Sequence, residues 1–169
     1  PDGKLLLFTS LVYPGCAPAD PKPGFDYDAG CNKKRLDEET ASKMHTRVYK
    51  HLLYRHWTEY QGSRRSHLLI QPLEGGAPRD LTPGDRDIPP FSLGSPESYG
   101  FSPDSSEITY VANTDPDLSI STNSDLFSIS VNGGEPKRLT NNPAADEGPL
   151  YSPDGKYLAF RTQIRAGYE

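Results

Sequence analysis

The sequence predicts an all-β fold: a partial β-propeller of four-stranded antiparallel blades, with a helical insertion in the first blade. Three observations predict it: a Pro-Asp turn motif that occurs three times, a Gly-Gly hairpin motif that occurs twice, and 15 Gly and 17 Pro among 169 residues. Many short strands joined by Gly- and Pro-rich turns are typical of sandwiches, barrels and propellers. A plain β-sandwich is the alternative, and the repeated motifs favour the propeller.

The turn motif has the same physical basis at each of its three places. Pro fixes φ, Asp accepts a hydrogen bond from the backbone that follows it, and Gly tolerates a positive φ. Residues of high β propensity follow the turn in each copy, so we expect a strand there. The copies are residues 1–10, 101–112 and 151–160. In the middle copy, Ser105 and Ser106 replace the Gly and Lys of the other two.

The Gly-Gly motif spans residues 66–82 and again 124–140, at an offset of 58 positions without a gap. It predicts a strand, a hairpin turn and a further strand that ends at Leu-Thr. Four strands in each period of about 50 residues are typical of a propeller blade. We expect three segments: blade 1 at about 1–98, blade 2 at about 99–148 and the start of blade 3 at 149–169. The chain begins inside a turn motif, so we expect it to be part of a longer protein.

The first period is longer than the second because it contains an insertion, residues 11–65. Within it, side chains at i, i+4 steps predict an amphipathic helix from about Lys33 to Trp57, capped by Asn32. We expect its apolar face to pack on a blade edge or on a neighbouring domain. The row on that face is Leu36, Thr40, Met44, Val48 and Leu52.

Cys16 and Cys31 flank a loop rich in Pro, Gly and Asp near the start of this insertion. A disulfide that closes the loop would stabilise the fold by about 3 kcal/mol in the chain-entropy model. It would also indicate an oxidising compartment, so we expect a periplasmic or secreted protein. Two free thiols are the alternative. A metal site needs more donors than this loop offers, and no cofactor is expected.

Other functions are disfavoured by charge and motif content. The net charge is −5 and the pI is about 5.4, which is unsuited to binding nucleic acid. No apolar run approaches the roughly 20 residues that span a membrane. The chain has no Gly-x-Ser-x-Gly motif, and its four histidines lack zinc-binding spacing. We therefore expect neither a catalytic residue nor a metal ligand in this chain.

The segment 54–60 is the part of the chain densest in functional side chains, because it combines aromatic rings, a cation and an acid. It predicts either an aromatic cluster that anchors a domain or a rim that meets substrate or a partner domain. Trp57 and Glu59 are its candidate binding residues. Arg165, near the end of the chain, is another candidate.

Several segments together resemble one peptidase family. The chain is similar to the N-terminal propeller of the prolyl oligopeptidase family, in its bacterial branch of dipeptidyl-peptidase and acylaminoacyl-peptidase enzymes. The most specific segment is Leu52 to Trp57, taken with Ser121 to Leu126. The remaining segments that carry the resemblance are 75–85, 89–94, 151–161 and 165–169.

The resemblance implies a propeller that covers a C-terminal α/β-hydrolase domain, limits substrate size and holds the N-terminal end of a peptide. It implies Glu59, Glu97 and Glu147 as candidates to bind the substrate's amine. The hydrolase domain itself is not in this chain, so we expect its Gly-x-Ser-x-Gly motif downstream in the gene. The alternative is a periplasmic TolB-like propeller that acts as a protein-interaction platform. In either case exposed strand edges favour self-association of this chain.

Overall fold

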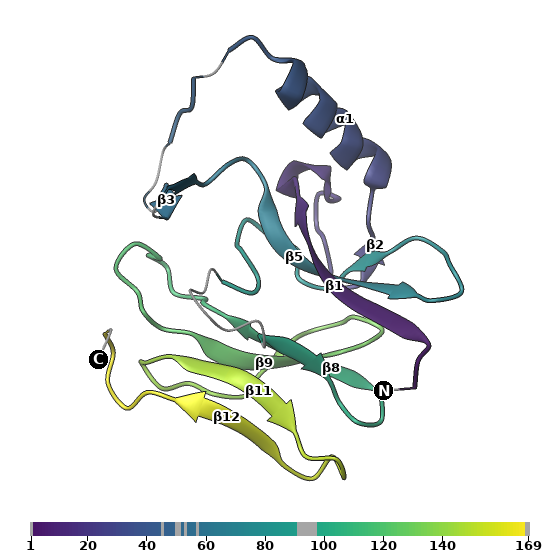
Figure 1. Ribbon diagram of the computed structural model, residues 1–169, viewed down its shortest axis with the longest axis vertical. Helices are drawn as coiled ribbons and strands as arrows, with labels where there is room; N and C mark the ends of the chain where they lie inside the picture. Colours follow the sequence, from purple (N-terminus) through teal and green to yellow (C-terminus); the bar gives the residue numbers. More distant parts are fainter. Residues whose placement is uncertain are drawn as a thin grey trace.

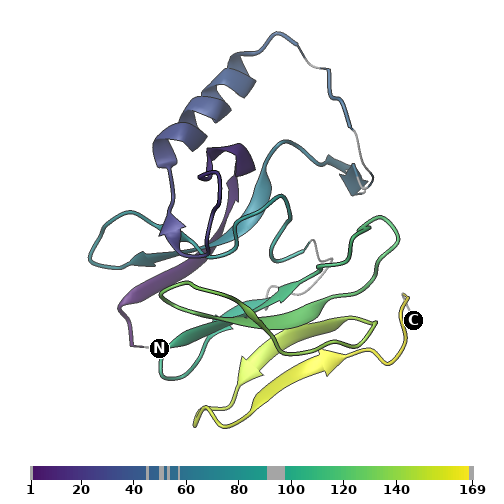
Figure 2. The ribbon, with the colours of Figure 1, turned by 180° about the vertical axis from the view of Figure 1, so that it is seen from behind.

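The chain is mostly β in the computed structural model, which describes residues 2–44, 46–49, 52, 54–56, 58–90 and 98–167 (Figure 1). The described part contains two four-stranded antiparallel sheets, two strand pairs and one α-helix. In Figures 1 and 2 the sheets follow one another down the molecule in chain order, and the helix lies at the end remote from the C-terminus. The prediction of a mostly β chain with four-stranded sheets and a helical insertion is confirmed.

The first sheet has the strand order β1-β5-β6-β2. β1 (Leu5–Val12) pairs with β5 (Arg65–Pro72) along the full length of both strands. The centre of β5 is buried at successive positions, as expected for a strand covered on both faces. β6 (Arg79–Asp80) follows the first Gly-Gly turn, and β2 (Phe25–Asp26) comes from the insertion and forms the outer edge.

The second sheet is a simple meander in which neighbours in the chain are neighbours in the sheet. Its strands are β7 (Tyr99–Phe101), β8 (Glu107–Ala112), β9 (Asp125–Ser130) and β10 (Lys137–Arg138). A strand pair, β11 (Asp146–Tyr151) with β12 (Leu158–Thr162), follows and lies against β8 and β9. Each turn motif therefore leads into β1, β8 or β12, as the sequence predicts.

The sequence repeats are also repeats of hydrogen bonding. The hydroxyl of Thr82 accepts the amide of Leu68 at 2.9 Å, and 58 positions later Thr140 accepts the amide of Leu126 at 3.0 Å. In the turn motifs, Ser105 adopts a φ of +60°, where the equivalent Gly155 has +71°. The repeated pattern of residues thus specifies a repeated backbone, including the left-handed conformation that glycine normally provides.

The hydrophobic core lies between the first two sheets. Side chains from β5 and from the segment after β6 pack there against side chains from β8 and β9. Large apolar groups on both facing sheets are removed from water, and this burial stabilises the fold by roughly 25 cal/mol for each Å² of apolar area buried. The buried members of this cluster are Leu68, Ile70, Leu81, Ile108, Tyr110, Ala112, Phe127 and Ile129.

The helix in the insertion is shorter and lies earlier than the sequence predicts. α1 spans Ala29–Ala41, and its N-cap is Asp28, whose carboxylate accepts the amide of Cys31 at 2.8 Å, in place of Asn32. The prediction that the helix continues to Trp57 is wrong, because Arg55–His56 and Glu59–Tyr60 form the strands β3 and β4. The apolar row does not pack on a sheet. Its members Met44, Val48 and Leu52 are exposed.

The insertion is tied to the first two sheets at separate points. The predicted disulfide between Cys16 and Cys31 is present, with the two Cα atoms 5.7 Å apart, beside a short 3-10 turn at Pro14–Cys16. It closes the loop that contains β2. At the tip of this loop, Pro23 accepts the amide of Gly134 at 3.1 Å, so the loop contacts the Gly-Gly turn of the second sheet.

Candidate functional site

One polar pair links the last two strands of each repeat. In the first sheet, Nδ1 of His67 lies 2.7 Å from a carboxylate oxygen of Asp80. At the equivalent positions of the second sheet, a guanidinium nitrogen of Arg138 donates to Asp125 at 2.5 Å. The acid is on the second of the two strands in one repeat and on the first in the other. The same cross-strand contact is therefore made with the two chemical roles exchanged.

The first of these pairs has the elements of an acid–base dyad but not its accessibility. His67 is 1% exposed, and its second ring nitrogen, Nε2, lies 2.9 Å from the carbonyl oxygen of Gly84. Asp80 is also buried and accepts the amide of Thr82 at 2.9 Å. A general base needs a free ring nitrogen within reach of substrate. Both nitrogens of His67 are already engaged, so the pair holds the sheet together.

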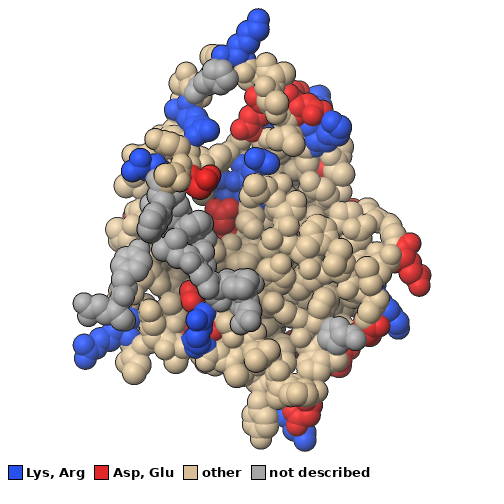
Figure 3. Space-filling model, in the orientation of Figure 1, with Lys and Arg blue, Asp and Glu red and all other residues tan. Residues whose placement is uncertain are grey.

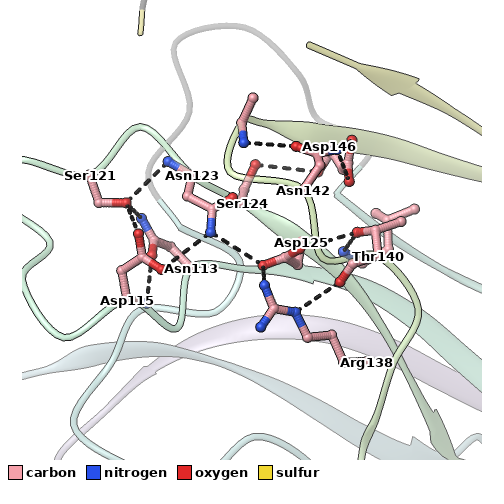
Figure 4. Close-up of polar contacts among 12 residues, drawn as sticks. Asn113, Asp115, Ser121, Asn123, Ser124, Asp125, Arg138, Thr140, Asn142 and Asp146 are labelled. Carbon is pink, nitrogen blue, oxygen red and sulfur yellow. Dashed lines mark hydrogen bonds and ion pairs between the residues drawn. The ribbon is translucent and has the colours of Figure 1, made fainter. Parts of the chain in front are cut away.

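The second pair belongs to a larger polar network at one end of β9 (Figure 4). Asp125 is fully buried and accepts weaker contacts from Asn123 and Thr140, both at 3.4 Å. Asn123 also donates to Asp115 at 3.2 Å, so it bridges two carboxylates. Asp115 accepts the hydroxyl of Ser121 at 2.6 Å. The network thus fixes the long loop between β8 and β9 onto the start of β9.

The hydrogen bonds of this loop lower the pKa of Asp115 below its usual range, the bond from Ser121 being the largest cause and that from Asn123 the next. Arg86, from the loop after the first sheet, donates to the backbone oxygens of Asn113 and Asp115 at 3.3 and 2.9 Å. The loop of the second sheet is therefore held from both sides. The ionised carboxylate of Asp115 is the form that accepts the bonds from Ser121 and Asn123.

A second group of contacts continues the network toward β11. Asp146 is fully buried, and the amide nitrogen of the Asn142 side chain donates to its two carboxylate oxygens at 2.7 and 2.8 Å. The backbone amide of Asp146 donates to Ser124 at 2.8 Å. Farther along β11, the hydroxyl of Tyr151 donates to Glu107 on β8 and accepts from Thr109. Burial, followed by the bond to Glu107, raises the pKa of Tyr151 to about 12.

These contacts make the network a structural joint between successive sheets. Its buried carboxylates are all engaged by donors, and among the described residues no cluster of His, Cys, Asp and Glu is arranged to hold a metal ion. A hollow of about 190 Å³ lies between β7 and β11, where Tyr99, Phe101 and Tyr151 contribute to its lining. It is smaller than the roughly 300–1,000 Å³ of most ligand pockets. No helix in the described part of the chain could cross a membrane.

Among the candidate binding residues that the structure describes, no hydrogen bond or ion pair joins Glu59, Glu147 and Arg165 to one another. Glu59 is exposed on β4, and Arg165 is exposed after β12. Glu147 lies on β11, where its carboxylate is 3.5 Å from a guanidinium nitrogen of Arg161. Trp57 and Glu97 lie outside the described residues. The roles of all five stay predictions.

Sequence reasoning missed a cluster of tyrosines and arginines around the β3–β4 hairpin. It singled out residues 54–60 but placed the preceding residues on a helix, and so overlooked Arg47 and Tyr49, which contact the hairpin. A signal was present in the charges. Residues 46–65 contain five Lys or Arg and one Glu, in a chain of net charge −5. Figure 3 shows several Lys and Arg side chains on the upper part of this face, around α1 and the hairpin.

Comparison with known proteins gives matches along nearly the whole chain. It is 31% identical over 176 residues to Dipeptidyl-peptidase 5 of Porphyromonas endodontalis, and 27% identical over 175 residues to Dipeptidyl-peptidase 5 of Porphyromonas gingivalis. These matches cover 99% and 100% of this chain but 23% of each relative. The chain thus spans about a quarter of the length of these relatives, and about three quarters of each relative lies outside the matched region.

Two further matches come from Agrobacterium. The chain is 29% identical over 168 residues to the uncharacterized protein Atu1656 of Agrobacterium fabrum, covering 96% of this chain and 48% of that protein. A solved structure, of a putative TolB from Agrobacterium tumefaciens, matches 59% of this chain and 31% of its own, with 29% identity and a TM-score of 0.42. No protein-family model matches the chain.

Proposed function

We propose that this chain is a non-catalytic propeller segment of a larger serine exopeptidase, of the dipeptidyl- or acylaminoacyl-peptidase type. In this proposal the propeller limits access to a separate α/β-hydrolase domain and positions peptides for it. The observation that carries the proposal is the match to Dipeptidyl-peptidase 5 over 99% of this chain but 23% of the relative. A match of that kind is expected when the chain is one part of a longer peptidase.

The fold is consistent with this role. A propeller consists of successive four-stranded sheets that pack against one another. The chain has two such sheets, which repeat their backbone hydrogen bonds and share a core. Such a scaffold offers loops and strand ends at the rim of each sheet, while its buried polar groups hold the sheets in place. The Cys16–Cys31 disulfide supports a periplasmic or secreted location, because disulfides persist in oxidising compartments.

The test is to sequence the gene beyond the codon for Glu169 and to assay its full product. We expect further sheet repeats, then a Gly-x-Ser-x-Gly motif followed by Asp and His. The full product should cleave dipeptidyl or aminoacyl chromogenic substrates and be blocked by a serine-reactive inhibitor. The 169-residue chain alone should show no turnover. A gene without the motif, whose product cleaves neither substrate, would favour the interaction platform and refute the peptidase assignment.

A further inference from the structure

An aromatic cluster lies on the β3–β4 hairpin, outside the larger sheets. Arg55 and Tyr60 are paired across the hairpin, and the amide of Gln61 donates to the carbonyl oxygen of Tyr54 at 2.9 Å. The ring of Tyr49 lies 5.1 Å from that of Tyr54 and 6.4 Å from that of Tyr60, between ring centroids. Three tyrosine rings therefore form one surface on a short strand pair.

Two arginines lie over one ring of this surface. The guanidinium carbon of Arg47 is 5.2 Å from the centroid of the Tyr60 ring, and that of Arg55 is 5.9 Å from it. These distances are typical of cation–π contacts. Both arginines are exposed, and within the described residues neither guanidinium has a hydrogen bond or an ion pair. We name this group the Arg–Tyr cluster: Arg47, Tyr49, Tyr54, Arg55 and Tyr60.

Among the residues that the structure describes, none engages the guanidinium donors of the cluster. Stacking on a ring leaves the five N–H groups of each guanidinium free to bind a planar anion in the plane of the fork. The hydroxyl oxygen of Tyr49 is shielded from solvent and has no hydrogen-bond partner in the described part of the chain. Because this oxygen is shielded, Tyr49 contributes its ring, and not its hydroxyl, to the surface that a ligand meets.

The base of the hairpin is fixed to the body of the protein. The side chain of Gln61 donates to Asp87 at 3.2 Å, and the hydroxyl of Ser63 donates to Glu39 of α1 at 3.1 Å. Glu39 also accepts the hydroxyl of Tyr13 at 2.6 Å. Glu39 and Asp87 are thus engaged by these donors, whereas Glu59 on β4 is exposed. Attachment at the base presents the cluster as a preorganised surface, which reduces the entropic cost of binding.

We propose that the Arg–Tyr cluster binds a peptide segment that carries a carboxylate. The two guanidinium groups would donate charge-assisted hydrogen bonds to the carboxylate, and the tyrosine rings would pack against the adjoining peptide. This inference goes beyond the proposed function, because it concerns the isolated chain and requires no hydrolysis.

Two features favour a peptide over a polyanion such as nucleic acid. The positive segment 46–65 is short, while the whole chain has a net charge of −5, so a long polyanion would be repelled by the remaining surface. Tyrosine and arginine are also the residues that dominate the energetics of protein and peptide interfaces. A single carboxylate within a peptide suits a pair of arginines on one ring.

Three pentapeptides test the proposal by titration calorimetry against the 169-residue chain. The first is acetylated, amidated and contains two glutamates; the second has glutamines instead; the third is the glutamine peptide with a free C-terminal carboxylate. Fluorescence of Trp57, the single tryptophan, gives a second readout, since it lies between β3 and β4 in the sequence. We expect at least one carboxylate peptide to bind roughly tenfold tighter than the neutral one. The tighter of the two identifies a side-chain or a C-terminal carboxylate as the source.

The double variant R47Q/R55Q should weaken that binding about tenfold or more, without changing the unfolding midpoint, because both side chains are exposed. The matched control K34Q/K137Q removes the same net charge at exposed sites away from the hairpin and should bind as the unmodified chain does. Equal affinity for all three peptides would overturn the proposal. So would equal losses in both double variants, or competition by inorganic phosphate as strong as that of the best peptide.

Discussion

His67 and Asp125 occupy equivalent positions on β5 and β9, and each makes the same contact with the strand that follows the Gly-Gly turn. The acid and its nitrogen-bearing partner have exchanged places between the repeats. When the repeats are aligned at an offset of 58 positions, His67 faces Asp125 and Asp80 faces Arg138, so each position by itself is a mismatch. The complementarity becomes visible only when the hairpin register is known, which pairs Leu69 with Asp80 and Phe127 with Arg138. Both pairs are therefore present in the sequence, but an alignment of the two repeats that scores residue identity does not detect them.

The two pairs should contribute unequally to stability because they differ in exposure. In the variant His67→Ala, Asp80 is left in the interior, and loss of one partner of a buried pair costs roughly 3–5 kcal/mol. Arg138 is 43% exposed and Asp125 keeps Asn123 and Thr140 as donors, so the expected cost of Arg138→Ala is smaller, about 1–3 kcal/mol. Urea unfolding of both variants measures the difference. Equal losses in the two variants would show that burial does not set the strength of these contacts.

Among the elements, the strands were predictable and the helix boundary was not. Turn chemistry with a fixed repeat offset specifies β1, β5, β8, β9 and β12. Each of them follows a Pro-Asp turn or precedes a Gly-Gly turn, and only a few residue types can form these turns. The predicted helix extended too far because it rested on a side-chain period alone. After Ala41 the chain contains Thr46, Val48 and Tyr49, whose side chains favour extended backbone. Pairing of Arg55 with Tyr60 then completes the hairpin in place of further helical turns.

The Gly-Gly turns offer a matched test of the contact between the insertion and the second sheet. Gly75 and Gly133 are equivalent and have φ values of +104° and +86°, so an alanine at either position costs about 1–2 kcal/mol in backbone strain. A Cβ at Gly133 would also lie 2.2 Å from the carbonyl oxygen of Pro23, whereas a Cβ at Gly75 meets nothing within 4 Å.

We therefore expect Gly133→Ala to destabilise the chain by about 2 kcal/mol more than Gly75→Ala, because backbone must move to relieve the clash. Chemical unfolding of the two variants gives this difference directly. If both variants lose the same stability, the loop that contains Pro23 does not contact the turn in solution.

At the scale of the whole molecule, the insertion links the first two sheets, which otherwise contact each other mainly through their packed core. Its loop supplies β2 to the first sheet and contacts the Gly-Gly turn of the second, and the Cys16–Cys31 disulfide closes that loop. The sequence predicted the disulfide and the position of the insertion. It could not predict this contact, because nothing in the composition of a surface loop specifies which distant turn it meets. The closed ring of a propeller stays a prediction.

The strand pair β11–β12 leads to the final prediction. In the described chain β12 pairs only with β11, and apolar side chains on or beside the pair are exposed, among them Leu150, Tyr157 and Phe160. An exposed edge strand with apolar side chains is a template for pairing with another chain. We expect sedimentation to show concentration-dependent self-association of the 169-residue chain. Phe160→Lys should weaken it, because a charge on the edge strand opposes pairing, whereas Met44→Lys, at an exposed apolar site far from this edge, should not. Association that persists in Phe160→Lys but disappears in Met44→Lys would place the contact on the insertion.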